Sequence, residues 1–275
     1  MNSARAAEDE LKNGDPAAAL QRLQDQVRAH PEDAKLRVFL FQLLCVLGNW
    51  ERALNQLEVA TNLDAGALAM GQMYGAAVRC EAVRRDVFEG RRSPMIFGEP
   101  DQWLALLIES LLTAGKGDPA GAERLRLQAF AEAPGTAGTL NGEPFEWIAD
   151  ADSRLGPVLE AIVNGRYYWL PFSRISTITM EAPEDLRDVV WMPAQFEFQN
   201  GGQVVGLIPS RYPGSETAGD GLLALARRTL WEEFASDAHR GLGQRVLATD
   251  SGDVPLLEVR SLTLQAADTP ATVSA

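Results

Sequence analysis

The acidic stretch at residues 143–154 holds the side chains that most resemble catalytic groups. Within it, Glu146, Asp150 and Asp152 are close enough in sequence to act as paired carboxylates in acid–base catalysis or as ligands of a hard cation. The stretch lacks the glycine-bearing spacing of a calcium loop, and Asp152 or Ser153 is well suited to cap a helix that begins near Leu155. We interpret the cluster as structural, and a hydrolase that uses these three carboxylates is the alternative.

The motif RYPGSE at residues 211–216 follows an expected strand, where functional residues often gather. Arg211 and the backbone of the Pro-Gly-Ser turn could bind an anion, and Arg211 would complete the hydrolase site. The motif lacks the spacing of a phosphate-binding loop, so a rigid turn is the simpler interpretation. The two histidines, His30 and His239, lie near no nucleophile motif, which argues against triad chemistry.

Charge and cysteine usage restrict the class of partner. The chain has 275 residues and a net charge of −13; residues 1–97 carry 12 basic and 13 acidic side chains, and residues 98–275 carry 13 and 25. Such an acidic second half would repel nucleic acid and anionic membrane.

Cys45 and Cys80 lie within helical patterns without zinc-like spacing, so we expect reduced core thiols, no metal and no cofactor. No apolar run suggests a membrane span or a signal segment, which predicts a cytoplasmic protein.

A helical repeat is expected in the first half of the chain. A shift of 34 residues places Gly14 on Gly48, and it also superposes Ala19 on Ala53. A 34-residue period with glycine at the turn between two helices, and a small residue five positions later, is typical of tetratricopeptide repeats. The third unit, residues 66–89, lacks the glycine and reads as one longer helix.

The second half is predicted to be a different kind of domain. From Pro144 onward, short β-type runs and turn signals indicate a mainly antiparallel sheet, with helices expected at residues 155–164 and 221–234. The predicted fold class is α+β: tetratricopeptide-like helical repeats followed by a smaller α+β domain. The predicted divisions are 1–135 for the helical domain, 136–265 for the α+β domain and 266–275 for a disordered tail.

Four ordered segments resemble the ImpE/SciE family, the TagJ accessory proteins of type VI secretion systems. They are LRVFLFQLLCVLGNWERAL (36–54), RSPMIFGEP (92–100), FEWIADADSRLGP (145–157) and RYPGSE (211–216). The resemblance implies a non-enzymatic adaptor that binds the N-terminal helix of the small sheath subunit, TssB. It also implies an effect on sheath assembly, or on disassembly by the ClpV unfoldase.

Repeat register gives a first hypothesis for the partner-binding residues. A helical repeat presents a groove into which an amphipathic helix can lay its apolar face. On this register, residues from two helices of the repeat would line the groove: Lys35, Val38, Gln42 and Cys45 from the first, and Gln72, Ala76 and Arg79 from the second. The alternative is that Val38 and Cys45 belong to the core.

Overall fold

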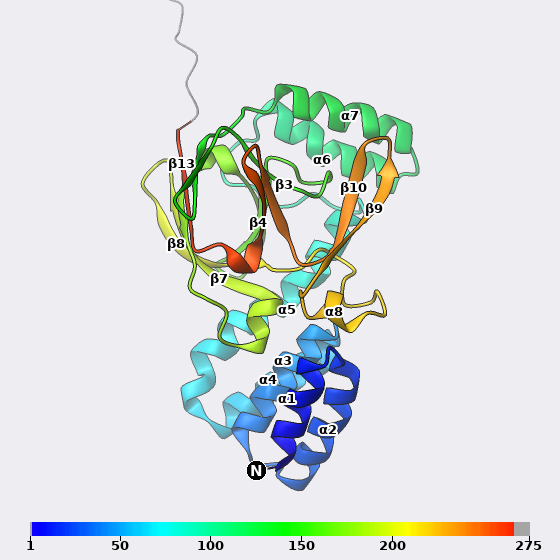
Figure 1. Ribbon diagram of the computed structural model, residues 1–275, viewed down its shortest axis with the longest axis vertical. Helices are drawn as coiled ribbons and strands as arrows, with labels where there is room; N and C mark the ends of the chain where they lie inside the picture. The colour runs from blue at the N-terminus through cyan, green and yellow to red at the C-terminus, as the bar shows by residue number, and fades with distance from the viewer. Residues whose placement is uncertain (1, 267–275) are drawn as a thin grey trace, which may run out of the picture.

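The computed structural model describes residues 2–266; the first helices lie at one end of a long molecule, and the strands, together with two later helices, lie at the other (Figure 1). The predicted tail, residues 266–275, lies outside the described residues except for Ala266. The first helices stand in antiparallel pairs, as the repeat predicts. They are α1 (Asn2–Lys12), α2 (Pro16–Ala29), α3 (Ala34–Val46), α4 (Trp50–Leu63), the short 3₁₀ turn η1 (Ala65–Ala67) and α5 (Leu68–Phe88).

The turns of the two helical pairs rest on the second half of the chain. Gly14 and Gly48 have φ values of 83° and 67°, which a residue with a Cβ rarely adopts. A Cβ at Gly14 would lie 2.7 Å from Leu222, and one at Gly48 would lie 2.5 Å from Glu216. The glycine that the period detects therefore both closes the turn and allows this close contact.

The second half is built around an eight-stranded antiparallel sheet with the order β2-β1-β13-β6-β7-β8-β4-β5. A three-stranded sheet has the order β12-β11-β3, and a two-stranded hairpin pairs β10 with β9. The strands are β1 (Gly138–Leu140), β2 (Glu143–Phe145), β3 (Ile148–Asp150), β4 (Val158–Val163), β5 (Arg166–Pro171), β6 (Ile175–Thr179), β7 (Trp191–Phe198), β8 (Gln203–Pro209), β9 (Thr229–Ala235), β10 (Ala238–Gly243), β11 (Val246–Thr249), β12 (Gly252–Pro255) and β13 (Ser261–Leu264).

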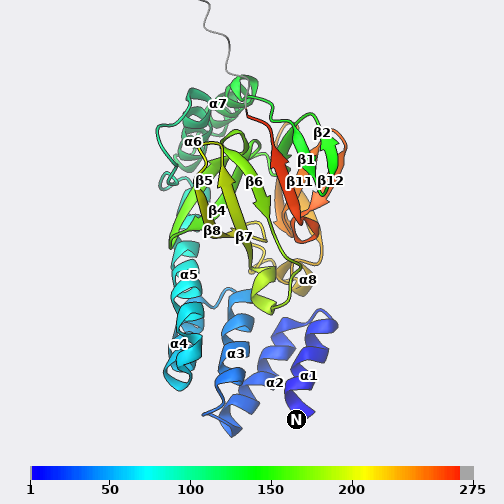
Figure 2. The same cartoon turned by 90° about the vertical axis from the view of Figure 1, so that its left-hand side faces the viewer.

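The long helix α5 joins the two halves. In Figure 2 it runs upward from the repeat to the edge of the sheet formed by β4 and β5. Ala77 and Val78 of α5 belong to the same buried cluster as Ile162 of β4 and Trp169 of β5. The other face of the sheet covers a second buried cluster, which includes Phe196 of β7. One core thus continues from the repeat into the sheet.

The remaining helices lie around the sheet. The pair α6 (Gln102–Gly115) and α7 (Pro119–Glu132) forms a further helical hairpin, at the opposite end of the molecule from α1–α4 (Figure 1). The single turn α8 (Gly221–Ala224) lies beside the repeat, and three 3₁₀ turns complete the elements. These are η2 (Phe172–Arg174), η3 (Leu186–Val189) and η4 (Leu256–Glu258).

Two of the predicted helices are wrong. Residues 158–163 form β4, a fully buried strand, because pairing with β5 and β8 decides the conformation of an apolar run that suits either state. Only residues 221–224 of the second predicted helix are helical, because Ala226 has a φ of 52° and ends the turn. The chain then enters β9.

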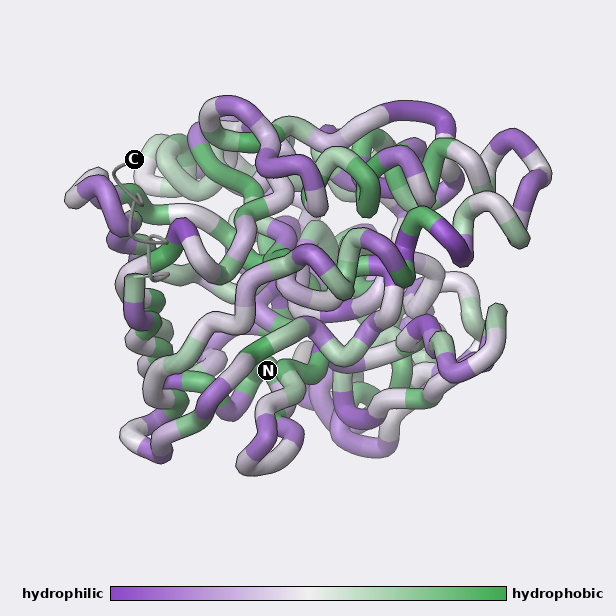
Figure 3. Tube along the Cα trace, turned by 90° about the horizontal axis from the view of Figure 1, so that it is seen from above, coloured by the Kyte–Doolittle hydropathy of each residue, from purple (hydrophilic) through white to green (hydrophobic). Residues whose placement is uncertain are grey.

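Hydropathy follows the layers of the fold. Seen along the long axis, the hydrophobic segments gather toward the inside and hydrophilic stretches occupy many outer turns (Figure 3). Within residues 2–266, no helix combines the length and apolar character that crossing a membrane requires.

Candidate functional site

The three carboxylates of the alternative hydrolase site do not meet in an open cleft. Asp150 and Asp152 are 3% and 0% exposed, whereas Glu146 is exposed on the segment after β2. Asp152 accepts hydrogen bonds from Arg154, and its Oδ2 also accepts from the backbone N–H of Gly241 at 3.0 Å. The carboxylates of Asp150 and Asp152 therefore hold separate elements together, and that of Glu146 lies apart from them at the surface.

Arg211 also has a structural position. Its guanidinium is buried and donates to the carbonyls of Cys45 and Val46 at the end of α3, and to that of Ala224 in α8. These carbonyls lie at the C-terminal ends of their helices, where the regular helical hydrogen bonds run out; that of Cys45 also accepts from Gly48 N at 3.1 Å. The RYPGSE motif thus connects the repeat to the α+β half. The Arg211 guanidinium is engaged by these carbonyls, so it is not free to bind an anion as the sequence suggested.

A buried network of charges lies where α5 meets the sheet. Arg245 pairs with both Asp150 and Glu160, and Arg84 of α5 donates to Glu160 at 2.6 and 3.0 Å. Glu81 of α5 lies 3.5 Å from Arg84. All five side chains are at most 9% exposed, so each charge depends on its partners for stabilisation.

Aromatic donors complete this network. The Tyr167 hydroxyl donates to Glu160 at 2.6 Å, and Trp169 Nε1 donates to that hydroxyl at 2.8 Å. Trp191 Nε1 donates to Glu81 at 2.7 Å. Tyr167, Trp169 and Trp191 therefore belong to the interface between the two halves.

Burial and pairing oppose each other in setting the pKa values of these acids. For Glu160, burial alone would raise the pKa, but Arg84, Arg245 and the hydrogen bonds that it accepts outweigh burial and lower the pKa to about 2. For Asp150, burial dominates over Arg245 and raises the pKa to about 6. For Glu81, burial also raises the pKa.

The contribution of Glu160 to the free energy of unfolding is expected to fall by about 3 kcal/mol as the pH is lowered from 4.5 to about 2. In this window the unfolded chain binds a proton at Glu160, whose ordinary pKa is 4.5, and the folded chain does not. Acid therefore favours the unfolded state. Urea unfolding at a series of pH values measures the slope; a Glu160→Gln variant should be less stable at neutral pH but should lack this loss.

The residues predicted on α3 divide into an open and a covered pair. Lys35 is exposed and Val38 is half-buried, whereas Gln42 and Cys45 are 6% and 0% exposed. Burial raises the pKa of the Cys45 thiol well above its ordinary value. This covered pair belongs to a fully buried run, residues 40–46.

The cover over this part of the repeat is the chain's own η3 segment. It lies against α3, and its Leu186 and Val189 pack on the repeat core. The Arg187 guanidinium lies 4.8 Å over the ring of Tyr74 in α5, and its Nη1 lies 3.1 Å from Met70 Sδ. A partner can therefore reach Lys35 and Val38 directly but not Gln42 or Cys45.

Two of the three residues predicted on α5 line a hollow. Gln72 and Ala76 border a cavity of about 410 Å³ between α5, the β4–β5 turn and β8. Arg79 is exposed one helical turn further along the same face. Apolar side chains form most of the wall: Met73, Ala76, Ile162, Val205 and Leu207.

Val205 is the most exposed of the apolar wall residues that the sequence analysis did not predict; Met73, Ile162 and Leu207 are the others. Val205 projects from β8 with 58% of its surface exposed, an unusual position for a β-branched residue in the middle of a sheet. It also borders a neighbouring hollow of about 300 Å³, which Glu181, Glu184 and Asp185 line. The apolar hollow thus continues into an acidic rim.

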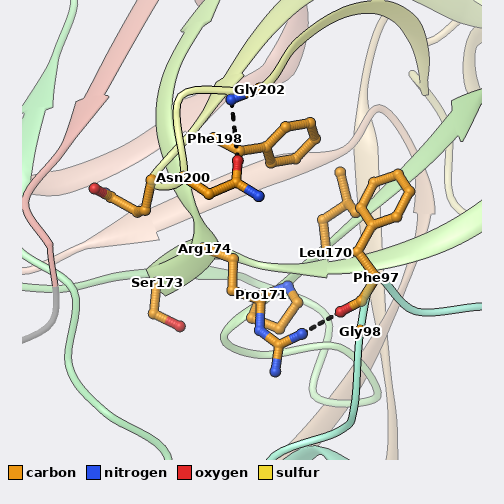
Figure 4. A pocket seen from close by; sticks show the side chains of 10 residues that line it. Phe97, Gly98, Leu170, Pro171, Ser173, Arg174, Phe198, Asn200 and Gly202 are labelled. Atoms are coloured by element: carbon orange, nitrogen blue, oxygen red, sulfur yellow. Dashed lines mark hydrogen bonds between the residues drawn. The ribbon is translucent and has the colours of Figure 1, made fainter.

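Another hollow lies elsewhere and contains none of the predicted residues. It measures about 530 Å³ and lies between Phe97 and the strand ends at Leu170 and Phe198 (Figure 4). Its one charged group, Arg174, already donates to the carbonyls of Phe97 and Glu99. Its walls are otherwise mainly apolar.

Within residues 2–266, no cluster of three or more histidine, cysteine or acidic side chains has a geometry that could hold a metal ion. The site that best combines predicted residues, open apolar surface and adjacent charge is the hollow between α5 and β8. We refer to the surface formed by Gln72, Met73, Ala76, Ile162, Val205 and Leu207 as the α5–β8 hollow.

Comparisons with known proteins agree with this two-part architecture. A family profile described as ImpE protein matches residues 142–263, and one described as tetratricopeptide repeat matches residues 10–76. The chain is 48% identical, over 265 residues, to a Pseudomonas aeruginosa protein described as type VI secretion system accessory component TagJ; the match covers 96% of this chain and 93% of that protein. A crystal structure of a Vibrio parahaemolyticus protein matches 94% of this chain and 97% of its own, with a TM-score of 0.85 and 25% identity.

Proposed function

The chain belongs to the ImpE/TagJ family, and from this premise we propose that it is a non-enzymatic, cytoplasmic accessory protein of a type VI secretion system. In this proposal it binds the N-terminal helix of the sheath subunit TssB in the α5–β8 hollow. Binding would bear on sheath assembly or on disassembly by ClpV. The observation that carries the proposal is the open apolar hollow, which contains Gln72 and Ala76 of the partner site predicted from the sequence.

The shape of the hollow suits an amphipathic helix. Such a helix buries apolar side chains spaced three and four residues apart in a groove. The hollow offers Met73 and Ala76 on one wall and Val205 on the other, with the buried Ile162 and Leu207 between them. Exposed apolar surface of this kind, next to polar residues, is typical of protein-binding sites.

The charge around the hollow indicates the polar face of the partner. Glu181, Glu184 and Asp185 line the adjoining hollow beyond Val205. Basic residues at that end of a bound helix would face these carboxylates, and attraction between them would speed association. At the other end, the exposed Arg79 would meet acidic residues.

The acidic cluster favours the adaptor over the hydrolase. A catalytic carboxylate must reach its substrate, either directly or through one water. Asp150 and Asp152 are buried within ion pairs and backbone hydrogen bonds, and Arg211 is directed at helix carbonyls. Asp150, Asp152 and Arg211 of the alternative site thus serve folding, and Glu146 is separate from them at the surface.

Hydrogen exchange tests the proposal and locates the site at once. The intact protein is mixed with a synthetic peptide that spans the N-terminal helix of the cognate TssB, and amide exchange is followed by mass spectrometry. We expect slower exchange at residues 70–80 of α5 and 203–208 of β8, because a bound helix excludes water there. A peptide of the same composition in scrambled order is the control. The proposal fails if the peptide changes exchange nowhere, or only on α3.

A further inference from the structure

The hairpin of β9 and β10 has one edge that is tied to the protein and one that is not. On the β10 side, three outward N–H groups donate to side chains: His239 to Ser153 Oγ at 3.0 Å, Gly241 to Asp152 Oδ2 at 3.0 Å and Gly243 to Ser215 Oγ at 2.7 Å. Among the described residues, β9 pairs with no strand except β10. Its outer edge is therefore open.

The register identifies the backbone groups on the open edge. Gln244 N donates to Arg228 O, which makes the opposed residues Thr229 and Gly243 a non-hydrogen-bonded pair. Because such pairs alternate along an antiparallel ladder, Trp231 and Glu233 also belong to non-hydrogen-bonded pairs. The N–H groups of Thr229, Trp231 and Glu233 thus point away from β10, at the spacing that an added strand requires.

Three large apolar side chains lie along the same strand. Leu230, Trp231 and Phe234 are 44%, 40% and 40% exposed, and every residue of β9 is exposed or half-buried. The Trp231 ring lies 5.5 Å from the ring of Tyr212, and Arg126 of α7 lies 5.0 Å over Phe234. These contacts hold the aromatic rings in place, so little side-chain entropy would be lost on binding.

The charges on the hairpin favour a basic partner strand. β9 carries Glu232 and Glu233, and the following turn adds Asp237. The one arginine in the hairpin, Arg240, is already paired with Glu232 at 2.8 Å. Opposite charges on neighbouring strands stabilise a sheet and like charges destabilise it. A basic strand fits this edge, whereas a second copy would bring another pair of glutamates to it.

We propose that the outer edge of β9 is a docking site for an extended, basic segment of another protein, which adds to the hairpin as a third strand. Backbone hydrogen bonds at Thr229, Trp231 and Glu233 would give affinity, and apolar and acidic side chains would give specificity. Figure 1 places this hairpin and β8 on opposite sides of the molecule. The proposal is therefore independent of the α5–β8 hollow and would allow two partners at once.

Two labelled peptides of about eight residues test the charge requirement, one alternating valine with lysine and the other alternating valine with glutamate. Fluorescence anisotropy with the intact protein should show saturable binding of the lysine peptide, at least tenfold tighter than the glutamate peptide. A Glu232→Lys, Glu233→Lys double variant should reverse this preference. Equal binding of both peptides, or of neither, overturns the proposal.

A matched pair of variants at one position tests the backbone mode. Glu233→Pro removes one outward N–H and leaves the bonds to β10 in place, which edge strands tolerate. Glu233→Gln removes the charge and keeps the N–H. We expect the Glu233→Pro variant to bind the lysine peptide at least tenfold more weakly than the wild type, and the Glu233→Gln variant about threefold more weakly. The circular dichroism spectrum of both variants should be unchanged. If the Glu233→Pro variant binds the lysine peptide as tightly as the Glu233→Gln variant does, strand addition is overturned. The wild-type protein could instead self-associate, and Glu233→Pro could abolish that association. This result would show that the occupant of the edge is a second copy of the chain, and it would overturn the proposal.

Discussion

An Arg245→Met substitution is expected to lower the free energy of unfolding by about 3–5 kcal/mol, because it leaves the buried Asp150 without its ion-pair partner and Glu160 with Arg84 alone. Arg245 is 0% exposed and pairs with Asp150 and Glu160, which are 3% and 0% exposed. Its Nε also donates to the carbonyl of Pro209 at 2.8 Å. Methionine fills a similar volume but replaces none of these interactions.

Urea unfolding at neutral pH measures this loss. Arg91→Met is the matched control, since Arg91 forms its ion pair with Asp86 at the surface and is 54% exposed. Exposed pairs contribute at most about 1 kcal/mol, so this variant should be nearly as stable as the wild type. A loss below about 1 kcal/mol in Arg245→Met would show that the buried network does not hold the two halves together.

Local pattern was sufficient to predict the repeat, and resemblance of ordered segments indicated the family, but local pattern failed where distant contacts decide the conformation. The glycine spacing at Gly14 and Gly48 is a property of neighbouring residues, and the helical pairs were predicted from it. The run at residues 158–163 was predicted as a helix, yet it forms β4 because its partners β5 and β8 lie in other parts of the chain. Glu160 within that strand finds Arg84 in α5, 76 positions earlier.

The candidate site shows the same limit. Repeat register placed Gln72 and Ala76 on an accessible face, and both line the α5–β8 hollow. Register could not reveal that η3 and Arg211 cover Gln42 and Cys45, because these elements follow more than 130 residues later. Nor could it reveal Val205, since an exposed valine in a strand has meaning only once its neighbours are known.

A Val205→Glu substitution is expected to weaken binding of the TssB helix at least tenfold. Val205 is 58% exposed at the open side of the hollow, so a carboxylate there can stay hydrated and leave the free protein folded. When a partner covers it, the carboxylate loses water and gains no hydrogen bond, which costs at least about 2 kcal/mol. Val38→Glu is the matched control, because Val38 lies on α3 outside the hollow.

Calorimetric titration of the wild type and these two variants with the TssB peptide tests the central claim most directly. The account predicts saturable binding to the wild type, at least a tenfold loss in Val205→Glu, and less than about a twofold change in Val38→Glu. Undiminished binding to Val205→Glu together with loss in Val38→Glu would place the partner on α3 and contradict the account. The absence of binding to the wild-type protein would contradict the proposed function itself.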